Sequence, residues 1–365
     1  CCLAARGPAQ VAAYTWAPLD PAADDVFWAR RTVAALGTVE HHIVPSECTP
    51  FAFSGIGGQD DVALDEPCAI TLDRRWLVIA DRAAARGSRM HLTGFGGDQV
   101  LGGSPAHLHT MLRHQPGTAL QNLRGYVALN RWSYRAVLPQ LLDNRSYRAW
   151  LLRFGADLTA APVSSLGPYF YWAKSMRLPP WATPAAAEAV RDLIRRVAPT
   201  VKPLGHGHGQ HQELADLGGL ARMTRNLAEL AHQRGIRLAA PYFDDRVIEA
   251  GLAVRPQERV TPWRFKQLAA AAMRGIVPDE TLTRQTKAIG SHEVEVGFRE
   301  NRADVLALCD NSRLGQLGLI NVAALREVCT RPLPTALEFH ALYPTLACEI
   351  WLRALERNAA SPLRA

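Results

Sequence analysis

The chain has 365 residues, 48% of them hydrophobic, which is enough to bury the core of one large domain or two smaller ones. No apolar run approaches the roughly 18 residues of a membrane-spanning helix, and no signal peptide opens the sequence. The net charge of +7 is dispersed, without the interleaved basic and aromatic residues of nucleic-acid-binding proteins. We therefore expect a soluble protein that binds neither membrane nor nucleic acid. Attraction for an anionic ligand such as a nucleotide is the alternative interpretation of the charge.

Seven cysteines are present, an odd number, and none has Cys-x-x-Cys or zinc-ligand spacing. This pattern is typical of reduced thiols in a cytoplasmic protein, mostly buried as small apolar side chains. The residues are Cys1, Cys2, Cys48, Cys68, Cys309, Cys329 and Cys348.

Strands and helices are expected to alternate through the first hundred residues. The opening CCLAARG is typical of a helix end capped at Gly7, and VAAYTW (11–16) of a buried strand. Asp24 and Asp25 begin a helix that stops at Gly37, and EHHIVP is the second strand. A loop at 46–67, a helix at 72–85 and a strand at 90–92 follow. The alternation predicts an α/β fold, with a doubly wound parallel sheet in a nucleotide-binding part at 1–105.

A loop unusually rich in glycine, HLTGFGGDQVLGGS (91–104), follows the third strand, with Asp98 among five glycines. Successive N–H groups in such a loop form a nest for an anion, and glycine lets a phosphate approach closely. A carboxylate there would repel phosphate unless a metal lies between them, so Asp98 is a candidate Mg²⁺ ligand. The alternative is a plain turn in which Asp98 caps the next helix.

Beyond residue 108 the pattern becomes helical, with amphipathic segments at 134–154 and 183–200 and Thr183 as an N-cap. GHGHGQH (205–211) could be a metal site, but we favour a flexible linker with solvated imidazoles. A long helical stretch at 211–235 is then expected, broken at Gly218–Gly219 and ending at Gly235.

Two further segments carry candidate functional residues. The aromatic stretch PYFYWAKSMRLPPW (168–181) favours core packing or a surface clamp, with a pocket wall for a peptide-like substrate as the alternative. In RQTKAIGSHEVEVGF (284–298), Lys287 follows Arg284 and precedes Gly290. A lysine in such a loop can stabilise developing negative charge, although the spacing alone favours a solvated surface lysine.

Three segments, in order, resemble the synthetase domain of the asparagine synthetase family, which includes β-lactam synthetases and the cyclases that close lasso peptides. They are TGFGGDQVLGG (93–103), the stretch 240–280 containing PYFDD, and RQTKAIG (284–290). The resemblance covers roughly residues 1–300, with a poor match in the helical middle. It implies a fold of the adenine nucleotide α-hydrolase-like (PP-loop ATPase) type. A large helical part at 106–365 would contain the catalytic lysine loop near 284–298.

The resemblance implies that ATP and Mg²⁺ activate a carboxylate, with release of pyrophosphate, and that an amine then displaces AMP. By the motif match, Asp98 would bind Mg²⁺, Lys287 would stabilise the transition state, and Lys266 would approach the phosphates. The residues implied at the ATP or pyrophosphate site are Thr93, Gly94, Gly96, Gly97, Tyr14 and Thr15. Those implied at the substrate pocket are Phe95 and Asp244.

Within the family, three details favour an actinobacterial lasso-peptide cyclase. Phe95 stands where asparagine synthetases carry glutamate and β-lactam synthetases tyrosine, and no glutamate lies between Asp98 and Glu188. The tail at 297–328 is also similar to that of lasso cyclases. Such an enzyme would act on a peptide precursor, beside a leader peptidase and a leader-recognition protein. Asparagine or β-lactam formation from a small carboxylate, and an inactive scaffold, are the alternatives.

The family's S-G-G-x-D-S pyrophosphate loop and its N-terminal glutaminase-like domain are absent from the sequence. SGIGGQD (54–60) imitates the loop, but no strand leads into it and no helix follows. CCLAARG fits the helix that comes after the loop, so we expect the loop to precede Cys1. The chain alone is then expected to be inactive.

Overall fold

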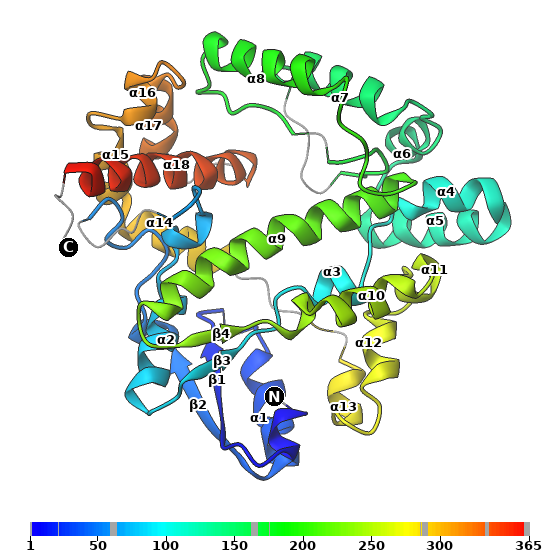
Figure 1. Ribbon diagram of the computed structural model, residues 1–365, viewed down its shortest axis with the longest axis vertical. Helices are drawn as coiled ribbons and strands as arrows, with labels where there is room; N and C mark the ends of the chain where they lie inside the picture. The colour runs from blue at the N-terminus through cyan, green and yellow to red at the C-terminus, as the bar shows by residue number, and fades with distance from the viewer. Residues whose placement is uncertain are drawn as a thin grey trace.

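The fold is described from a computed structural model for residues 2–20, 22–58, 64–161, 167–174, 176–284, 286, 291–332 and 336–360. It is a mixed α/β protein in which helices predominate (Figure 1). The predicted alternation at the N-terminal end is confirmed. Its elements are β1 (Val11–Ala17), α1 (Asp25–Leu36), β2 (Val39–Pro45), α2 (Arg75–Ala85) and β3 (Met90–Leu92).

Local sequence explains where these elements begin and end. Asp25 lies in the first turn of α1, where the positive end of the helix dipole stabilises a carboxylate. Gly37 ends the helix with φ of 68°. The expected helix end at the start of the chain is wrong in part. Ala4–Arg6 forms a single 3-10 turn (η1), and Gly7 is extended at φ −91° and ψ 179°, so no left-handed cap forms there.

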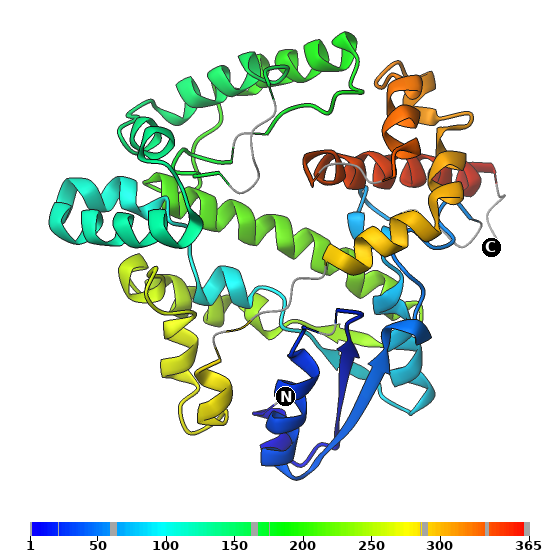
Figure 2. The same ribbon diagram turned by 180° about the vertical axis from the view of Figure 1, so that it is seen from behind.

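The described strands form two separate two-stranded parallel sheets. β1 pairs with β2, and β3 pairs with β4 (Arg237–Ala239), so one continuous doubly wound sheet is not seen among these strands. The two sheets share an apolar cluster, because Tyr14 of β1 and Leu238 of β4 pack against Ala80, Ala83, Ala231 and Ile236. Figures 1 and 2 show both pairs gathered at one end of the molecule.

Six helices of eight or more residues form the middle of the chain. They are α4 (His107–His114), α5 (Pro116–Asn130), α6 (Tyr134–Leu141), α7 (Tyr147–Ala156), α8 (Pro184–Val197) and α9 (His208–His232). Thr183 caps α8 as predicted, its side chain accepting a hydrogen bond from the Ala186 N–H at 3.1 Å. The helix α9 crosses the centre of the molecule (Figure 1). It is continuous through Gly218–Gly219, so the predicted break is wrong, although Gly235 does follow its end with φ of 74°.

The last third of the chain is helical, as predicted. Its elements are α10 (Asp245–Ala253), α11 (Pro256–Arg259), α12 (Gln267–Ala272), α13 (Asp279–Leu282), α14 (Ser291–Glu300), α15 (Arg302–Cys309), α16 (Arg313–Gln316), α17 (Val322–Thr330) and α18 (Ala336–Ala360). Three more 3-10 turns are η2 (Ser46–Cys48), η3 (Ala69–Leu72) and η4 (Pro241–Phe243). The largest apolar cluster joins this part to Phe53 and Trp181, both fully buried.

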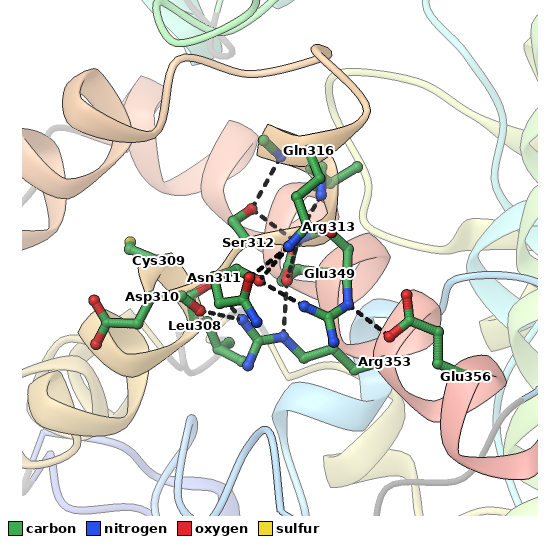
Figure 3. A network of polar contacts seen from close by, with 12 residues as sticks. Leu308, Cys309, Asp310, Asn311, Ser312, Arg313, Gln316, Glu349, Arg353 and Glu356 are labelled. Carbon is green, nitrogen blue, oxygen red and sulfur yellow. Dashed lines mark hydrogen bonds and ion pairs between the residues drawn. The ribbon is translucent and has the colours of Figure 1, made fainter. Parts of the chain in front are cut away.

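A buried carboxylate ties α16 to α18 (Figure 3). Glu349 accepts hydrogen bonds from the Ser312 hydroxyl at 2.9 Å, the Arg313 and Leu314 N–H groups at 2.9 and 3.0 Å, and Arg353 at 2.8 Å. Burial alone would raise the pKa of Glu349, but these donors together hold it below its ordinary value. The network therefore fixes the C-terminal helices and lies apart from the predicted site.

The histidines of GHGHGQH were expected to be solvated, and for two of them this is wrong. His208 and His211 are only 2% and 5% exposed because they belong to the first turn of α9. The His208 ring stacks on His109 at 3.7 Å, and the His211 ring lies 4.7 Å from Tyr147. Within the described residues, no group of three or more His, Cys, Asp or Glu side chains could hold a metal.

Other predictions concern the character of the side chains. In the aromatic stretch at 168–181, Phe170 and Trp181 are fully buried, which favours core packing for both. The described cysteines are free thiols, and Cys68, Cys309 and Cys329 are buried. No helix in the described part of the chain is long and apolar enough to cross a membrane.

Candidate functional site

The glycine loop leaves the carboxyl end of β3, where the two parallel strands β3 and β4 both end. The Thr93 N–H donates to the Ala239 carbonyl at 2.9 Å, which extends the strand pairing by one residue. Gly96 then turns the chain with φ of 89° and ψ of −21°, and α3 (Gly97–Leu101) begins. Only glycine adopts this conformation without strain, so the sequence folds the loop back into a helix at this point.

The glycines of this loop serve different purposes. A Cβ at Gly94 would meet no described heavy atom within 4 Å, so the backbone there is open. A Cβ at Gly96 would lie 3.0 Å from the Tyr242 Cβ, and one at Gly97 3.1 Å from the Tyr242 ring. The Gly97 N–H donates to the Gly94 carbonyl at 3.2 Å. The loop is therefore held by η4 and by its own hydrogen bonds, and it leaves space for a ligand at Gly94.

A buried ion pair anchors the far end of the same loop, and the sequence analysis did not find it. The Arg259 guanidinium and the Glu213 carboxylate lie 2.6 Å apart and are 2% and 4% exposed. Arg259 also donates to the Gly102 carbonyl at 2.8 Å, and Glu213 accepts from the Ser104 N–H at 3.2 Å. Gly103 is required because a Cβ there would lie 2.6 Å from the Glu213 carboxylate. The two residues are 46 positions apart in the sequence, so no local pattern indicates that they pair.

The structure brings two of the predicted site residues together. Asp98, in the first turn of α3, forms an ion pair with Lys266, which precedes α12. Both side chains remain accessible, Asp98 being 54% and Lys266 38% exposed. Lys266 has φ of 45° and ψ of 47°, a left-handed conformation that is uncommon outside glycine. A carboxylate and an ammonium therefore meet beside the open loop.

The donor set at Asp98 fits magnesium bound together with a nucleotide. Mg²⁺ in phosphate-transfer sites is usually held by one or two carboxylates, with phosphate oxygens and water completing the octahedron. Asp98 offers one accessible carboxylate, and the lysine that pairs with it is itself partly exposed. When bound, the ion would neutralise charge on the phosphate oxygens.

Tyr14 and Thr15 lie on β1, away from the glycine loop in sequence. The Thr15 hydroxyl hydrogen-bonds the His41 imidazole at 2.9 Å, and the Tyr14 ring lies 5.0 Å from that of His42. Both contacts reach across to β2 and hold the two strands together. The predicted place of these residues along an adenine stays a prediction.

The predicted pocket residues Phe95, within the loop, and Asp244, at the start of α10, make separate contacts. The Phe95 ring lies 5.3 Å from that of Trp76 in α2, which forms an apolar wall. Asp244 caps α10 by accepting from the Arg246 N–H at 3.0 Å, and its carboxylate also bonds the Arg246 side chain at 2.9 Å. These contacts hold the pKa of Asp244 below its ordinary value. Asp244 therefore has a structural role whatever it does in a pocket.

Lys287 lies outside the described residues, but two residues shortly before it in the sequence are anchored to the start of α1. Arg284 donates to Asp24 at 2.5 Å and to Asp25 at 2.6 Å. The Thr286 hydroxyl also hydrogen-bonds Asp24, and this bond holds the pKa of Asp24 below its ordinary value. The acidic start of α1 thus holds Arg284 and Thr286, a role that the helix-dipole interpretation of Asp24 and Asp25 missed.

A second buried carboxylate follows the lysine loop. Glu293 in α14 is 3% exposed and accepts from the Leu19 N–H at 3.0 Å, just beyond the carboxyl end of β1. Nothing in the sequence indicated that this residue is buried, because a glutamate in an amphipathic helix is usually solvated. The contact joins α14, which follows the predicted lysine loop in sequence, to the loop between β1 and α1.

The fold and these contacts define an α/β protein with an accessible carboxylate and lysine at the carboxyl ends of parallel strands. Ligands of α/β proteins bind at such ends. The sequence model of the family described as asparagine synthase matches residues 1–353. No curated protein and no solved structure matches the chain. The chain belongs to the asparagine synthase family, whose members are ATP-dependent ligases that form amide bonds.

Proposed function

We propose that the protein adenylates a carboxylate and joins it to an amine, and that its reaction is macrolactam closure of a lasso-peptide precursor. A carboxylate oxygen attacks the α-phosphorus of ATP, and the bond to the departing pyrophosphate breaks. The amine nitrogen then attacks the acyl carbon, AMP leaves, and the nitrogen loses a proton. The observation that carries this proposal is the Asp98–Lys266 pair beside the open Gly94, in a chain of this family.

In this proposal the charged side chains act on the phosphates. Asp98 would hold Mg²⁺, Lys266 would move from Asp98 to a phosphate oxygen, and Lys287 would stabilise charge in the transition state. Thr93, with the backbone of Gly94, Gly96 and Gly97, lines the phosphate site. The reaction then depends on electrostatics and positioning and needs no covalent enzyme intermediate.

The proposed fold places the adenine along β1, beside Tyr14 and Thr15. This requires the two strand pairs to be parts of one doubly wound sheet of PP-loop type. The apolar cluster shared by Tyr14 and Leu238 supports that arrangement, because it joins β1 to β4 through α2 and α9.

A peptide is the substrate we favour. Phe95 and Trp76 present an apolar wall next to the loop, where a glutamate would be needed to hold the amino group of free aspartate. The precursor's N-terminal amine would be joined to an aspartate or glutamate side chain. A leader peptidase and a leader-recognition protein in the cytoplasm are the proposed partners. The enzymatic alternative is asparagine or β-lactam formation. The non-enzymatic alternative is an inactive scaffold.

ATP–pyrophosphate exchange, with the protein in its full encoded length, tests these possibilities. Exchange that depends on a linear precursor peptide would support the cyclase. Exchange with free aspartate or a small amino acid would overturn it in favour of small-molecule amide formation. If the folded protein neither catalyses ATP–pyrophosphate exchange nor binds ATP, the inactive scaffold is the remaining hypothesis.

Lys287→Ala tests the assigned transition-state role. Turnover should fall steeply while ATP binding persists, because the lysine acts on charge that develops only during reaction. Lys202→Ala, which removes an exposed lysine before α9, is the matched control and should leave turnover unchanged. A loss within about threefold, less than ~1 kcal/mol of barrier, would show that the role is wrong.

A further inference from the structure

The positive charge of the protein is concentrated in one region. Residues 106–187 include eight arginines and one lysine but only two aspartates, and this excess of seven positive charges equals the net charge of the whole chain. Outside this region remain 32 of the 41 basic and 32 of the 34 acidic side chains, so the rest of the chain is neutral. The basic residues are dispersed along the sequence, but the acidic residues that would balance them are rare in this region.

The region contains α4 to α7, and Figures 1 and 2 show α4, α5 and α6 at the edge of the molecule away from the C-terminal helices. Both aspartates are already paired, Asp143 with Arg145 at 2.5 Å and Asp157 with Arg153 at 2.9 Å. Among the residues that the structure describes, four other arginines are exposed and form no ion pair. They are Arg124, Arg131, Arg135 and Arg148.

The helix α6 presents an apolar stripe beside these arginines. Tyr134, Leu138 and Leu142 are spaced four residues apart, so they lie along one face, and they are 47%, 43% and 62% exposed. Val137 and Leu141, on the adjoining part of the same face, are buried in an apolar cluster with α5. The apolar face of α6 is therefore only partly covered. An exposed apolar surface that adjoins charged residues is typical of an interaction site.

The chemistry of this face indicates the kind of partner. The forked guanidinium of arginine matches a carboxylate, and exposed arginines beside tyrosine and leucine are typical of protein interfaces. A second copy of the same face would carry the same positive charge and be repelled. A nucleic acid would pair with the arginines but would leave the leucines without apolar partners. Carboxylates together with apolar side chains complement both features.

We propose that the outer face of α5 and α6 docks an acidic amphipathic segment of a partner protein. Carboxylates of the segment pair with Arg131 and Arg135, and its apolar side chains cover Tyr134, Leu138 and Leu142. None of these residues belongs to the proposed ATP site, so the proposal does not depend on adenylation.

The test is the binding of two labelled peptides to the full-length protein, measured by fluorescence anisotropy. The peptide EELLEELEELLEELE should bind saturably, with a Kd of about 10–100 µM. Binding should weaken several-fold between about 0.05 and 0.5 M NaCl, because salt screens the ion pairs. The peptide KKLLKKLKKLLKKLK has the same leucines and the opposite charge, so it should not bind. No saturable binding of the acidic peptide, or equal binding of both peptides, would overturn the proposal.

Charge reversal locates the binding face. Arg131→Glu with Arg135→Glu should weaken binding of the acidic peptide at least about tenfold, because carboxylates then face carboxylates. Arg225→Glu with Arg299→Glu makes the same change of charge at exposed arginines on α9 and α14 and should bind within about twofold of the parent. An equal loss in both double variants would mean that the peptide responds to the overall charge, and would exclude this face. The thermal midpoint of each variant shows whether it is folded.

A second pair of variants tests the apolar stripe. Leu138→Gln removes its central side chain and should weaken binding at least about fivefold. Leu355→Gln, at an exposed position on α18, is the matched control and should leave binding unchanged. No difference between the two would overturn the docking of an amphipathic segment.

Two other anionic probes distinguish the class of partner. Vesicles of phosphatidylglycerol and a single-stranded oligonucleotide should each bind more weakly than the acidic peptide, because neither presents carboxylates beside apolar side chains. Tighter binding of the vesicles would overturn the proposal in favour of a membrane surface, and tighter binding of the oligonucleotide in favour of a nucleic acid.

Discussion

Asp98 and Lys266 combine an exposed ion pair with an uncommon backbone conformation. An exposed pair of this kind contributes only about 0–1 kcal/mol to stability. A non-glycine residue in the left-handed region costs about 1–3 kcal/mol, and such residues cluster at functional sites. Lys266 has φ of 45°, so the free-energy cost of its backbone conformation is larger than the stabilisation expected from the ion pair. In the proposed function, contact between Lys266 and a phosphate oxygen would account for this placement.

Asp98→Asn separates the metal role from the ion-pair role. The variant should need at least about tenfold more Mg²⁺ for half-maximal exchange, because it removes the accessible carboxylate. Its stability should change by less than about 1 kcal/mol. Asp81→Asn is the control, since Asp81 forms a comparable exposed pair with Arg234 at 3.1 Å. An unchanged Mg²⁺ titration of exchange would remove Asp98 as a ligand.

The central helix α9 tolerates two glycines that the sequence analysis took for a break. A Cβ at Gly218 or Gly219 meets no described atom within 4 Å, whereas one at Gly209 would lie 2.5 Å from the His107 backbone nitrogen. Gly218→Ala and Gly219→Ala should each stabilise the protein by roughly 0.5–1 kcal/mol, because alanine loses less entropy in a helix. Gly209→Ala, in the same helix, should destabilise it. Urea denaturation measures all three, and a loss of stability at Gly218 would mean that the helix is broken there.

The Arg259–Glu213 pair makes α9, α11 and the glycine loop depend on one another. Removing either partner leaves a buried charge, so Glu213→Gln or Arg259→Met should cost about 3–5 kcal/mol. The double variant should cost clearly less than the sum, because neither charge is then left alone. A double-mutant cycle by chemical denaturation measures this coupling. Additive losses would mean that the two side chains act independently.

Features that depend on neighbouring residues could be predicted from the sequence, whereas contacts between distant segments could not. The N-cap at Thr183, the helix end at Gly37 and the existence of the strands β1 and β2 follow from local chemistry, and the sequence predicted them. The packing of His208 did not follow, because Gly-His alternation resembles a linker until α4 covers it. The Arg284–Asp24 contact was likewise unpredictable, since spacing along a chain carries no information about which distant helix start receives an arginine.

At the scale of the whole molecule, the segment before the lysine loop is fastened to the N-terminal elements. Arg6 donates to the Gly275 carbonyl at 2.6 Å, and the Thr32 and Thr281 hydroxyls lie 2.9 Å apart. Arg284 also donates a hydrogen bond to Asp24, just before α1. The segment at 275–284 therefore lies against the first N-terminal elements, although the two are more than 240 residues apart in the sequence.

Buried imidazoles link the stability of this whole assembly to pH. Burial lowers the pKa of His107, His109, His208 and His211, all of which pack between α4 and α9 or beside them. For His208 the pKa falls to about 4, where burial and nearby His109 outweigh the opposing hydrogen bond to Phe170 and the charge of Asp143. Below about pH 6.5 the unfolded chain then binds protons that the folded chain does not.

Stability should therefore be complete above pH 6.5 and fall as the pH is lowered toward 4. His208 alone should account for about 2 kcal/mol between pH 7 and 5, at ~1.4 kcal/mol for each unit below its unfolded pKa. Between pH 7 and 5 few unfolded carboxyl groups titrate, so the imidazoles dominate this part of the pH range. Urea midpoints at several pH values measure the slope. His208→Gln should flatten it, whereas His206→Gln, at an exposed position two residues earlier, should not. An equal slope in both variants would mean that His208 is protonated in the folded protein and that its stacking on His109 does not exclude the charge.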